Sequence, residues 1–261
     1  MDESDKPYNS SGDDFLLSYL GMLGIPMDIV PQFPTDAKTV LLTEDAKYDP
    51  AIVDKIKGQL QAGKNVVITS GLLKALQGKG IEDIVELEYT GKTVSARDFF
   101  GWGLYAHADS DILLPEIRYA SNDAWEVVSA LTSPSRTSGT PLLQAKYSKG
   151  VLYVLTIPQS QGDLYSLPPD VVKAIANVLA RDLYVHVEGP GKLSLFVYDN
   201  DKFIVESFQE SFSPVRIVTD KRIARLRDML SGQQLAGTPQ GDKMVFETFL
   251  RPGSYRVFTA E

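Results

Sequence analysis

Residues 49–70, DPAIVDKIKGQLQAGKNVVITS, decide the fold class. Asp49 followed by Pro50 is typical of a helix N-terminus, and Gly63 is expected to end that helix. Apolar residues recur between them at helical spacing: Ile52, Val53, Ile56 and Leu60. The apolar run 66–68 predicts a strand buried on both faces, and residues 71–76 predict a second helix directly after it. Strands and helices that alternate in this way predict an α/β domain.

The sequence before this segment extends the pattern. Residues 15–23 have the apolar spacing of a helix, and residues 39–43 are a short apolar run of the kind found in buried strands. Residues 27–33 lie among three prolines, so a strand is expected there only at the edge of a sheet.

The sequence after this segment is less regular. Residues 81–135 predict strands at 85–89 and 112–117 and a loop around 99–105, in no order that the sequence defines. A hairpin is expected at 141–156, and a helix from Pro168. Because βαβ crossovers are right-handed, the first domain is expected to be a parallel sheet with helices on both faces.

Short strands separated by turn residues follow residue 189 and are typical of a small antiparallel β-sandwich. About six are expected, at 193–198, 203–208, 215–219, 224–230, 244–250 and 255–259. We therefore predict an α/β domain at 15–188 and a β-sandwich domain at 189–261. Residues 1–14, rich in Asp, Ser and Asn, are typical of a linker or an added tail, so the chain is expected to be part of a longer protein.

Composition limits the function classes. The formal net charge of −8 argues against nucleic acid and against an anionic membrane as partners. The chain contains no cysteine, which excludes disulfides, thiolate metal sites and a cysteine nucleophile. No apolar run approaches the length of a membrane span, and the polar start is unlike a signal peptide. A soluble chain without a cofactor is expected, and the compartment of its parent protein, cytoplasmic, periplasmic or secreted, stays open.

Several stretches together resemble the middle and last domains of family forty-two β-galactosidases. In the α/β part these are YLGMLGIP at 19–26, VVITSGLL at 66–73 and PLLQAKYSKGVLYVLTIP at 141–158. In the β part they are SLFVYDNDKFIVESF at 194–208 and SYRVFTAE at 254–261. The resemblance implies a flavodoxin-like, class I glutamine-amidotransferase-like trimerisation domain followed by a C-terminal β domain.

The same resemblance implies what this chain lacks. In those enzymes a catalytic barrel with two carboxylates precedes the middle domain, and no residues before Phe15 are available to form one. True amidotransferases place a cysteine in the sharp turn after a central strand, where this chain has Thr69, Ser70 and Gly71. The usual route of glutamine hydrolysis is therefore excluded.

Three residues are candidates for hydrolytic catalysis. Ser70 follows a buried strand, as a nucleophile elbow would, but Ile68 stands where that motif has glycine, and a serine that caps the helix from Gly71 is the favoured interpretation. His107 and Asp109 lie in an acidic stretch that offers a base or cation ligands but lacks the pattern of a calcium loop. A solvated acidic loop is the alternative, and no metal site is predicted.

An aromatic cluster with polar neighbours is the candidate for carbohydrate binding. Flat rings stack on the apolar faces of sugars, while amides and carboxylates bind hydroxyl groups. The residues are Trp102, Tyr105, Asn122, Asp123 and Trp125. Packing between domains or subunits explains the same residues.

The sequence thus favours a non-catalytic scaffold of a glycoside hydrolase-like protein, which supports oligomerisation or shapes an active-site entrance. Its partners would be further copies of the chain or the catalytic domain of the parent protein. The alternatives are a carbohydrate-binding module that uses Trp102 and Trp125, and a hydrolase with an unfamiliar serine or metal-assisted site at Ser70 and His107.

Overall fold

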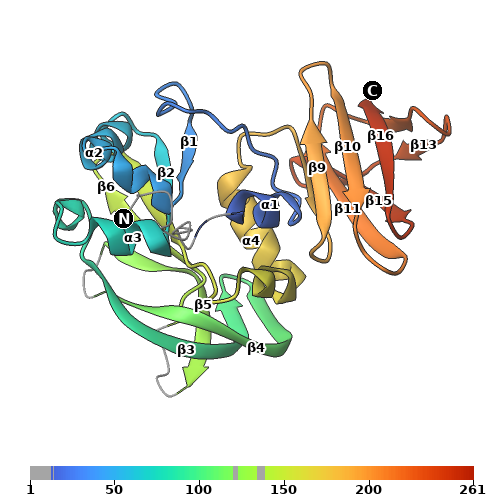
Figure 1. The fold of residues 1–261 in the computed structure, drawn as a ribbon. Helices are drawn as coiled ribbons and strands as arrows, with labels where there is room; N and C mark the ends of the chain where they lie inside the picture. Colours follow the sequence, from blue (N-terminus) through green and yellow to red (C-terminus); the bar gives the residue numbers. More distant parts are fainter. Residues whose placement is uncertain (1–12, 14, 120–122, 134–138) are drawn as a thin grey trace, which may run out of the picture.

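The computed structural model describes residues 13, 15–119, 123–133 and 139–261. Apart from Asp13, the predicted tail at 1–14 lies outside these residues. Figure 1 shows a larger part built on one curved sheet and, at the right, a smaller part built only of strands. The helices are α1 (Leu16–Gly21), α2 (Ile52–Gln61), α3 (Ser70–Leu76) and α4 (Pro169–Leu179), with short 3-10 turns η2 (Glu44–Tyr48), η3 (Ile81–Asp83) and η4 (Gln161–Ser166).

A seven-stranded mixed sheet forms the larger part. In spatial order its strands are β1 (Thr39–Leu42), β2 (Asn65–Thr69), β7 (Gly150–Leu155), β6 (Leu142–Tyr147), β5 (Ala124–Ser133), β3 (Leu87–Gly101) and β4 (Leu104–Tyr119). β1, β2 and β7 are parallel, whereas every other pairing in this sheet is antiparallel. The expectation of a parallel sheet therefore holds for three strands and is corrected for the rest.

The chain connections explain this change of direction. Helix α2 connects β1 to β2. This crossover returns the chain to the end of the sheet at which β1 began, so that β2 runs parallel to β1. The connection between β6 and β7 is a tight turn in which Ser148 has φ 55°, which makes these strands antiparallel. Trp102 and Gly103 alone join β3 to β4, and Gly103 has φ 70°, a left-handed conformation that suits glycine.

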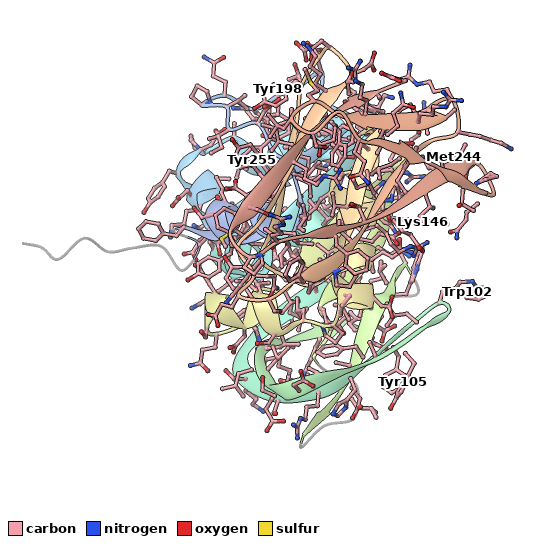
Figure 2. The ribbon with its side chains drawn as sticks, turned by 90° about the vertical axis from the view of Figure 1, so that its right-hand side faces the viewer. Trp102, Tyr105, Lys146, Tyr198, Met244 and Tyr255 are labelled. Atoms are coloured by element: carbon pink, nitrogen blue, oxygen red, sulfur yellow. The ribbon has the colours of Figure 1, made fainter. Side chains whose placement is uncertain are left out.

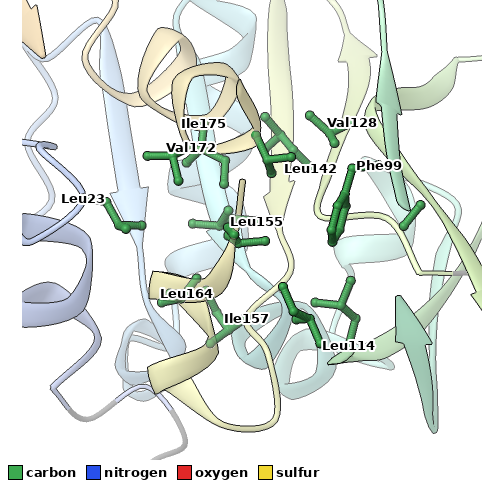
Figure 3. Close-up of a cluster of buried hydrophobic side chains, with 14 of the residues drawn as sticks. Leu23, Phe99, Leu114, Val128, Leu142, Leu155, Ile157, Leu164, Val172 and Ile175 are labelled. Atoms are coloured by element: carbon green, nitrogen blue, oxygen red, sulfur yellow. The ribbon is translucent and has the colours of Figure 1, made fainter. Parts of the chain in front are cut away.

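Two apolar cores lie on the two faces of this sheet. The run at 66–68 supplies both, because Val67 packs in one core while Val66 and Ile68 pack in the other. Helices α2 and α3 cover the face of Val66, and α1, α4 and η4 cover the face of Val67. Figure 3 shows the core that contains Val67, with Val172 and Ile175 of α4 above Leu155.

Two antiparallel sheets form the smaller part. The first has the order β13 (Gln234–Ala236), β12 (Arg225–Asp228), β16 (Ser254–Ala260), β10 (Lys202–Ser207) and β9 (Leu193–Val197). The second has the order β14 (Thr238–Gln240), β15 (Lys243–Leu250), β11 (Ser213–Asp220) and β8 (Val185–Glu188). Phe203, Phe246 and Phe258 are fully buried between them, so the sandwich-like second part is as expected.

The two parts are joined by backbone and side-chain contacts. Leu193 N donates to Met22 O at 2.8 Å, and Leu23 and Leu193 form an isolated parallel bridge. Lys173 of α4 pairs with Glu188 of β8 at 2.8 Å. These contacts hold α1 and α4 against the first strands of the smaller part.

Local expectations differ from the structure at several points. Residues 27–33 form no strand, because Pro31 and the flanking Pro26 and Pro34 lack backbone N–H donors and β1 itself forms the edge of the sheet. The loop expected at 99–105 is instead the end of β3, a two-residue turn and the start of β4. The acidic stretch around His107 is also part of β4, where alternate side chains face solvent.

Candidate functional site

The turn after β2 contains Ser70, the candidate nucleophile. Thr69 is the last residue of β2, and α3 begins at Ser70. The side chain of Thr69 accepts a hydrogen bond from Leu72 N at 3.2 Å, so Thr69 caps this helix. The capping role expected of Ser70 therefore belongs to its neighbour.

Asp13 fills the space above this turn. Its side chain is 7% exposed, and Oδ2 accepts hydrogen bonds from Thr69 Oγ1 at 2.5 Å and from Glu44 N at 2.6 Å. Burial raises the pKa of this carboxyl above its ordinary value, against the opposite effect of the two hydrogen bonds. The turn is so crowded that a Cβ atom at Gly71 would lie 2.8 Å from Glu44 Oε2 and 3.3 Å from Asp13 Oδ1.

Ser70 lies under this cover. The residue is 2% exposed, and its Oγ accepts a hydrogen bond from Ile157 N at 3.0 Å, just after β7. Among the described residues, no hydrogen bond joins this hydroxyl to a histidine. The arrangement buries the hydroxyl and uses it to connect two neighbouring strand ends.

His107 and Asp109 lie on β4 at the opposite edge of the sheet from β1. The Nδ1 atom of His107 is 2.7 Å from Asp98 Oδ1, across the β3–β4 pair. The backbone oxygen of Asp109 accepts a hydrogen bond from Arg97 Nη2 at 2.5 Å. His107 thus has an acidic partner that the sequence did not indicate, because nine residues separate the two and only the strand register brings them together.

Four of the five proposed carbohydrate contacts lie in the described residues. Trp102 is fully exposed at the tip of the β3–β4 hairpin, and Tyr105 is exposed with its ring 5.2 Å from that of Phe100. Figure 2 shows Trp102 pointing away from the rest of the chain. Trp125 is half-buried on β5 and lies 5.3 Å from Lys146 Nζ, which stands over its ring.

The strand register places both tryptophans at one end of the sheet. Gly101 pairs with Val128, so the hairpin tip reaches the part of β5 that contains Trp125. Asp123 is exposed in the turn before β5, and its backbone oxygen accepts a hydrogen bond from Lys146 N at 3.0 Å. Asn122 lies outside the described residues. No ring contact joins Trp102 to Trp125 in the described part of the chain.

Neither a metal site nor a membrane span is found in the part of the chain that the structure describes. No three His, Asp or Glu side chains there are grouped so that they could hold an ion. No helix there is both long and apolar enough to cross a bilayer.

Two family models match the sequence. The model described as "Uncharacterized protein SSO3021, second domain" matches residues 3–160, more than half of the 261 residues. The model described as "Probable glycosyl hydrolase, C-terminal domain" matches residues 184–260. No curated protein matches the chain.

Solved glycoside hydrolases are similar to this chain in fold. The GH42 beta-galactosidase Gan42B from G. stearothermophilus is 12% identical with a TM-score of 0.53, over 96% of this chain and 36% of its own. The beta-galactosidase from Bacillus circulans sp. alkalophilus is 11% identical with a TM-score of 0.51, over 94% and 36%. The alpha-L-fucosidase isoenzyme 2 from Paenibacillus thiaminolyticus is 13% identical with a TM-score of 0.54, over 100% and 47%.

The chain therefore spans between about a third and a half of the length of these structures. At such low identity the likeness is one of fold. The resemblance to family forty-two β-galactosidases that the sequence indicated is confirmed at that level.

Proposed function

The chain belongs to the family described as "Uncharacterized protein SSO3021, second domain", and on this premise we propose that it is a non-catalytic accessory region of a glycoside hydrolase-like protein. The match of residues 184–260 to a glycosyl hydrolase C-terminal domain supports the association with carbohydrate-active enzymes. The region would support assembly of the parent protein or shape the entrance to its active site.

The position of Asp13 carries the non-catalytic part of the proposal. A nucleophile needs an approach path for its substrate and an adjacent base. Here the carboxylate of Asp13 covers the turn after β2, and the Ser70 hydroxyl already accepts a hydrogen bond from Ile157 N. A turn filled in this way holds the fold together and leaves no room for a reacting group.

We further propose that the first domain descends from a class I amidotransferase-like, flavodoxin-like fold. The parallel strands β1, β2 and β7, with helices on both sheet faces, would be the retained part. The antiparallel strands β3 to β6 would be later additions at the other side of the sheet.

A division of the chain into two domains is part of the same proposal. The predicted boundary follows residue 188, but β8 pairs with β11 in the second part, which favours a boundary at about residue 184. The two family models also leave residues 161–183 between them.

The test is an assay of the purified chain on aryl glycosides and aryl esters, together with its mass in solution. We expect no turnover above that of buffer, for the chain and for Ser70→Ala and His107→Ala alike. Turnover that either substitution abolishes would refute the scaffold role and support a serine hydrolase. A mass of two or more chains would assign the region to oligomerisation, and a monomer would assign it to shaping a neighbouring domain.

The exposure of Trp102 favours carbohydrate binding as a second function. A tryptophan exposed at a hairpin tip adds nothing to the core, and its ring is free to stack on a sugar. Trp125 lies toward the same end of the sheet and would extend such a surface, whereas Tyr105 faces the opposite side of the sheet from Trp125.

This second function predicts that the chain is retarded in electrophoresis gels that contain a soluble polysaccharide. Trp102→Ala should abolish the retardation without changing stability, while Trp125→Ala should weaken both because Trp125 is half-buried. Equal mobility with and without every glycan tried, or retardation that survives Trp102→Ala, would count against it.

A further inference from the structure

Strand β1 forms a free edge of the seven-stranded sheet, with β2 as its only neighbour in the described chain. Asn65 N donates to Lys38 O at 2.8 Å, and the parallel register then directs the backbone groups of Val40 and Leu42 toward β2. The N–H and C=O groups of Thr39 and Leu41 therefore point away from the sheet. A peptide strand laid along this edge would find two donors and two acceptors.

The segment that passes beside this edge does not pair with it. Residues 26–34 are part of the connection from α1 to β1 (Figure 1) and contain Pro26, Pro31 and Pro34. Proline has no backbone N–H and so cannot complete a ladder. Within the described residues, no backbone hydrogen bond joins residues 26–34 to β1.

A groove lies between this segment and the strand, and we call it the β1 groove. Its volume is about 780 Å³, within the range of about 300–1,000 Å³ typical of ligand sites. Met27 and Phe33 of the segment, Leu41 of β1 and Leu179 of α4 give it apolar walls. Ile29, at 77% exposure, and Val30 extend this apolar surface along the segment.

The charges that line the groove are mostly negative. Asp28, Asp45, Asp49 and Asp182 line it, against Lys38 as the only cation among the described lining residues. Lys38 lies 3.9 Å from Asp182, and Asp49 pairs with Lys55. No ion pair is formed by Asp28 or Asp45 with another described residue, so their charges are available to a cationic partner.

We propose that the β1 groove binds an extended peptide segment of another protein, in which apolar and basic residues alternate, as an added strand beside β1. Main-chain hydrogen bonds to Thr39 and Leu41 would hold the peptide, and alternate side chains would enter the apolar groove or face the carboxylates. The inference does not depend on the proposed function, because it uses no residue of the turn after β2 or of the aromatic cluster.

One pair of variants isolates the backbone contact. Leu41→Pro removes the outward N–H but leaves the β1–β2 ladder intact, because Leu41 N does not point toward β2. Leu41→Ala removes the same side chain and keeps the N–H, so it is the matched control. Loss of one hydrogen bond should weaken peptide binding by about five- to tenfold in the proline variant relative to the alanine variant.

A second pair isolates the charge and stays informative if Leu41→Pro fails to fold. Asp28→Lys combined with Asp45→Lys reverses two exposed charges at the groove. Asp199→Lys combined with Asp242→Lys makes the same net change at exposed sites of the smaller part. The first double variant should weaken the binding of a basic peptide about tenfold, and the second should leave it nearly unchanged.

The probe is a fluorescein-labelled peptide of alternating lysine and valine, with a glutamate–valine peptide as its control. We expect a saturable rise in anisotropy for the basic peptide alone, and slower amide hydrogen exchange at Thr39 and Leu41 when it is bound. No saturation up to about 1 mM peptide, the weak end of the affinity scale, would overturn the proposal. The proposal would also be overturned if, without peptide, exchange of the same amides slowed at higher protein concentration while the mass in solution increased. A second copy of the chain would then occupy the edge of β1.

Discussion

Thr69 and Asp13, 56 positions apart in the sequence, are joined by a 2.5 Å hydrogen bond from the threonine hydroxyl to the buried carboxylate. The same carboxylate oxygen accepts a hydrogen bond from Glu44 N, so one side chain ties the N-terminal segment to the ends of β1 and β2. This contact stabilises the fold at the turn after β2.

Removal of the Asp13 carboxylate should destabilise the protein. Asp13→Ala leaves the N–H of Glu44 and the hydroxyl of Thr69 without their acceptor, at a cost of about 1–3 kcal/mol in the free energy of unfolding. Asp13→Asn keeps an acceptor oxygen and should lose less. Urea unfolding of the three proteins measures the difference, and equal stabilities would show that the contact contributes nothing.

The same carboxyl group should make stability depend on pH. Burial raises its pKa in the folded state, so the folded chain binds this proton more tightly than the unfolded chain does. The stability it contributes is then complete below the unfolded pKa of about 4 and is lost as the pH rises through the folded pKa. The free energy of unfolding of the wild type, relative to Asp13→Asn, should fall from pH 3 to pH 7. A difference that is flat, or that rises with pH, would contradict the environment described for Asp13.

The buried Asp228 and the partly buried Arg256 form an ion pair in the smaller part, with 2.6 Å between Oδ2 and Nε. Burial opposes ionisation of Asp228, but hydrogen bonds from Arg256, Ser231 N and Leu230 N outweigh it and lower the pKa. Asp228→Ala should cost about 1–3 kcal/mol, because it leaves Nε of the partly buried Arg256 and the N–H groups of Leu230 and Ser231 without their acceptor.

The exposed pair of Asp201 and Arg222, at 3.9 Å, is the matched control. Asp201→Ala should change the free energy of unfolding by less than about 1 kcal/mol. Thermal or urea unfolding compares the two variants. Similar losses in both would mean that the burial of Asp228 has no energetic consequence.

Thr140 should tolerate loss of its hydroxyl. The residue is 1% exposed, and its Oγ1 has no hydrogen-bond partner in the described part of the chain. A buried hydroxyl without a partner costs about 1–3 kcal/mol, so Thr140→Val should raise the midpoint of urea unfolding. Thr156→Val is the contrasting variant, because its hydroxyl donates to Thr140 O at 2.6 Å, and it should lower the midpoint.

The elements that the sequence predicted well are those whose local signals agree. The helix and strand within 49–70 appear as α2 and β2, and the hairpin at 141–156 appears as β6 and β7. In each of these elements the apolar residues recur with a single period, that of a helix or that of a strand, and a residue that ends the element follows them. The local sequence was therefore sufficient to predict each element.

The long strands β3 and β4 could not be predicted in the same way. Their register contains shifts between Tyr89 and Thr93 and between Ala96 and Asp98, and such bulges interrupt the alternation by which a strand is recognised. The pairing of Asp98 with His107 depends on this register and has no local signal.

The sequence predicted the turn at Ser70, but it did not predict that the side chain of Asp13 covers this turn. The sequence predicted a strand at 66–68 and a helix from Gly71, and the structure has β2 ending at Thr69 and α3 beginning at Ser70. The contact of Asp13 with Thr69 joins residues far apart in the chain, and the polar sequence around Asp13 is typical of a linker. A buried carboxylate in such a stretch becomes visible only once the fold is known.

The most direct test of the inert turn is intact-mass analysis of the full chain after incubation with a fluorophosphonate probe, which modifies activated serines. The account predicts an unmodified mass, because the hydroxyl of Ser70 is covered and bonded to Ile157 N. A single adduct that maps to Ser70 and disappears in Ser70→Ala would contradict it.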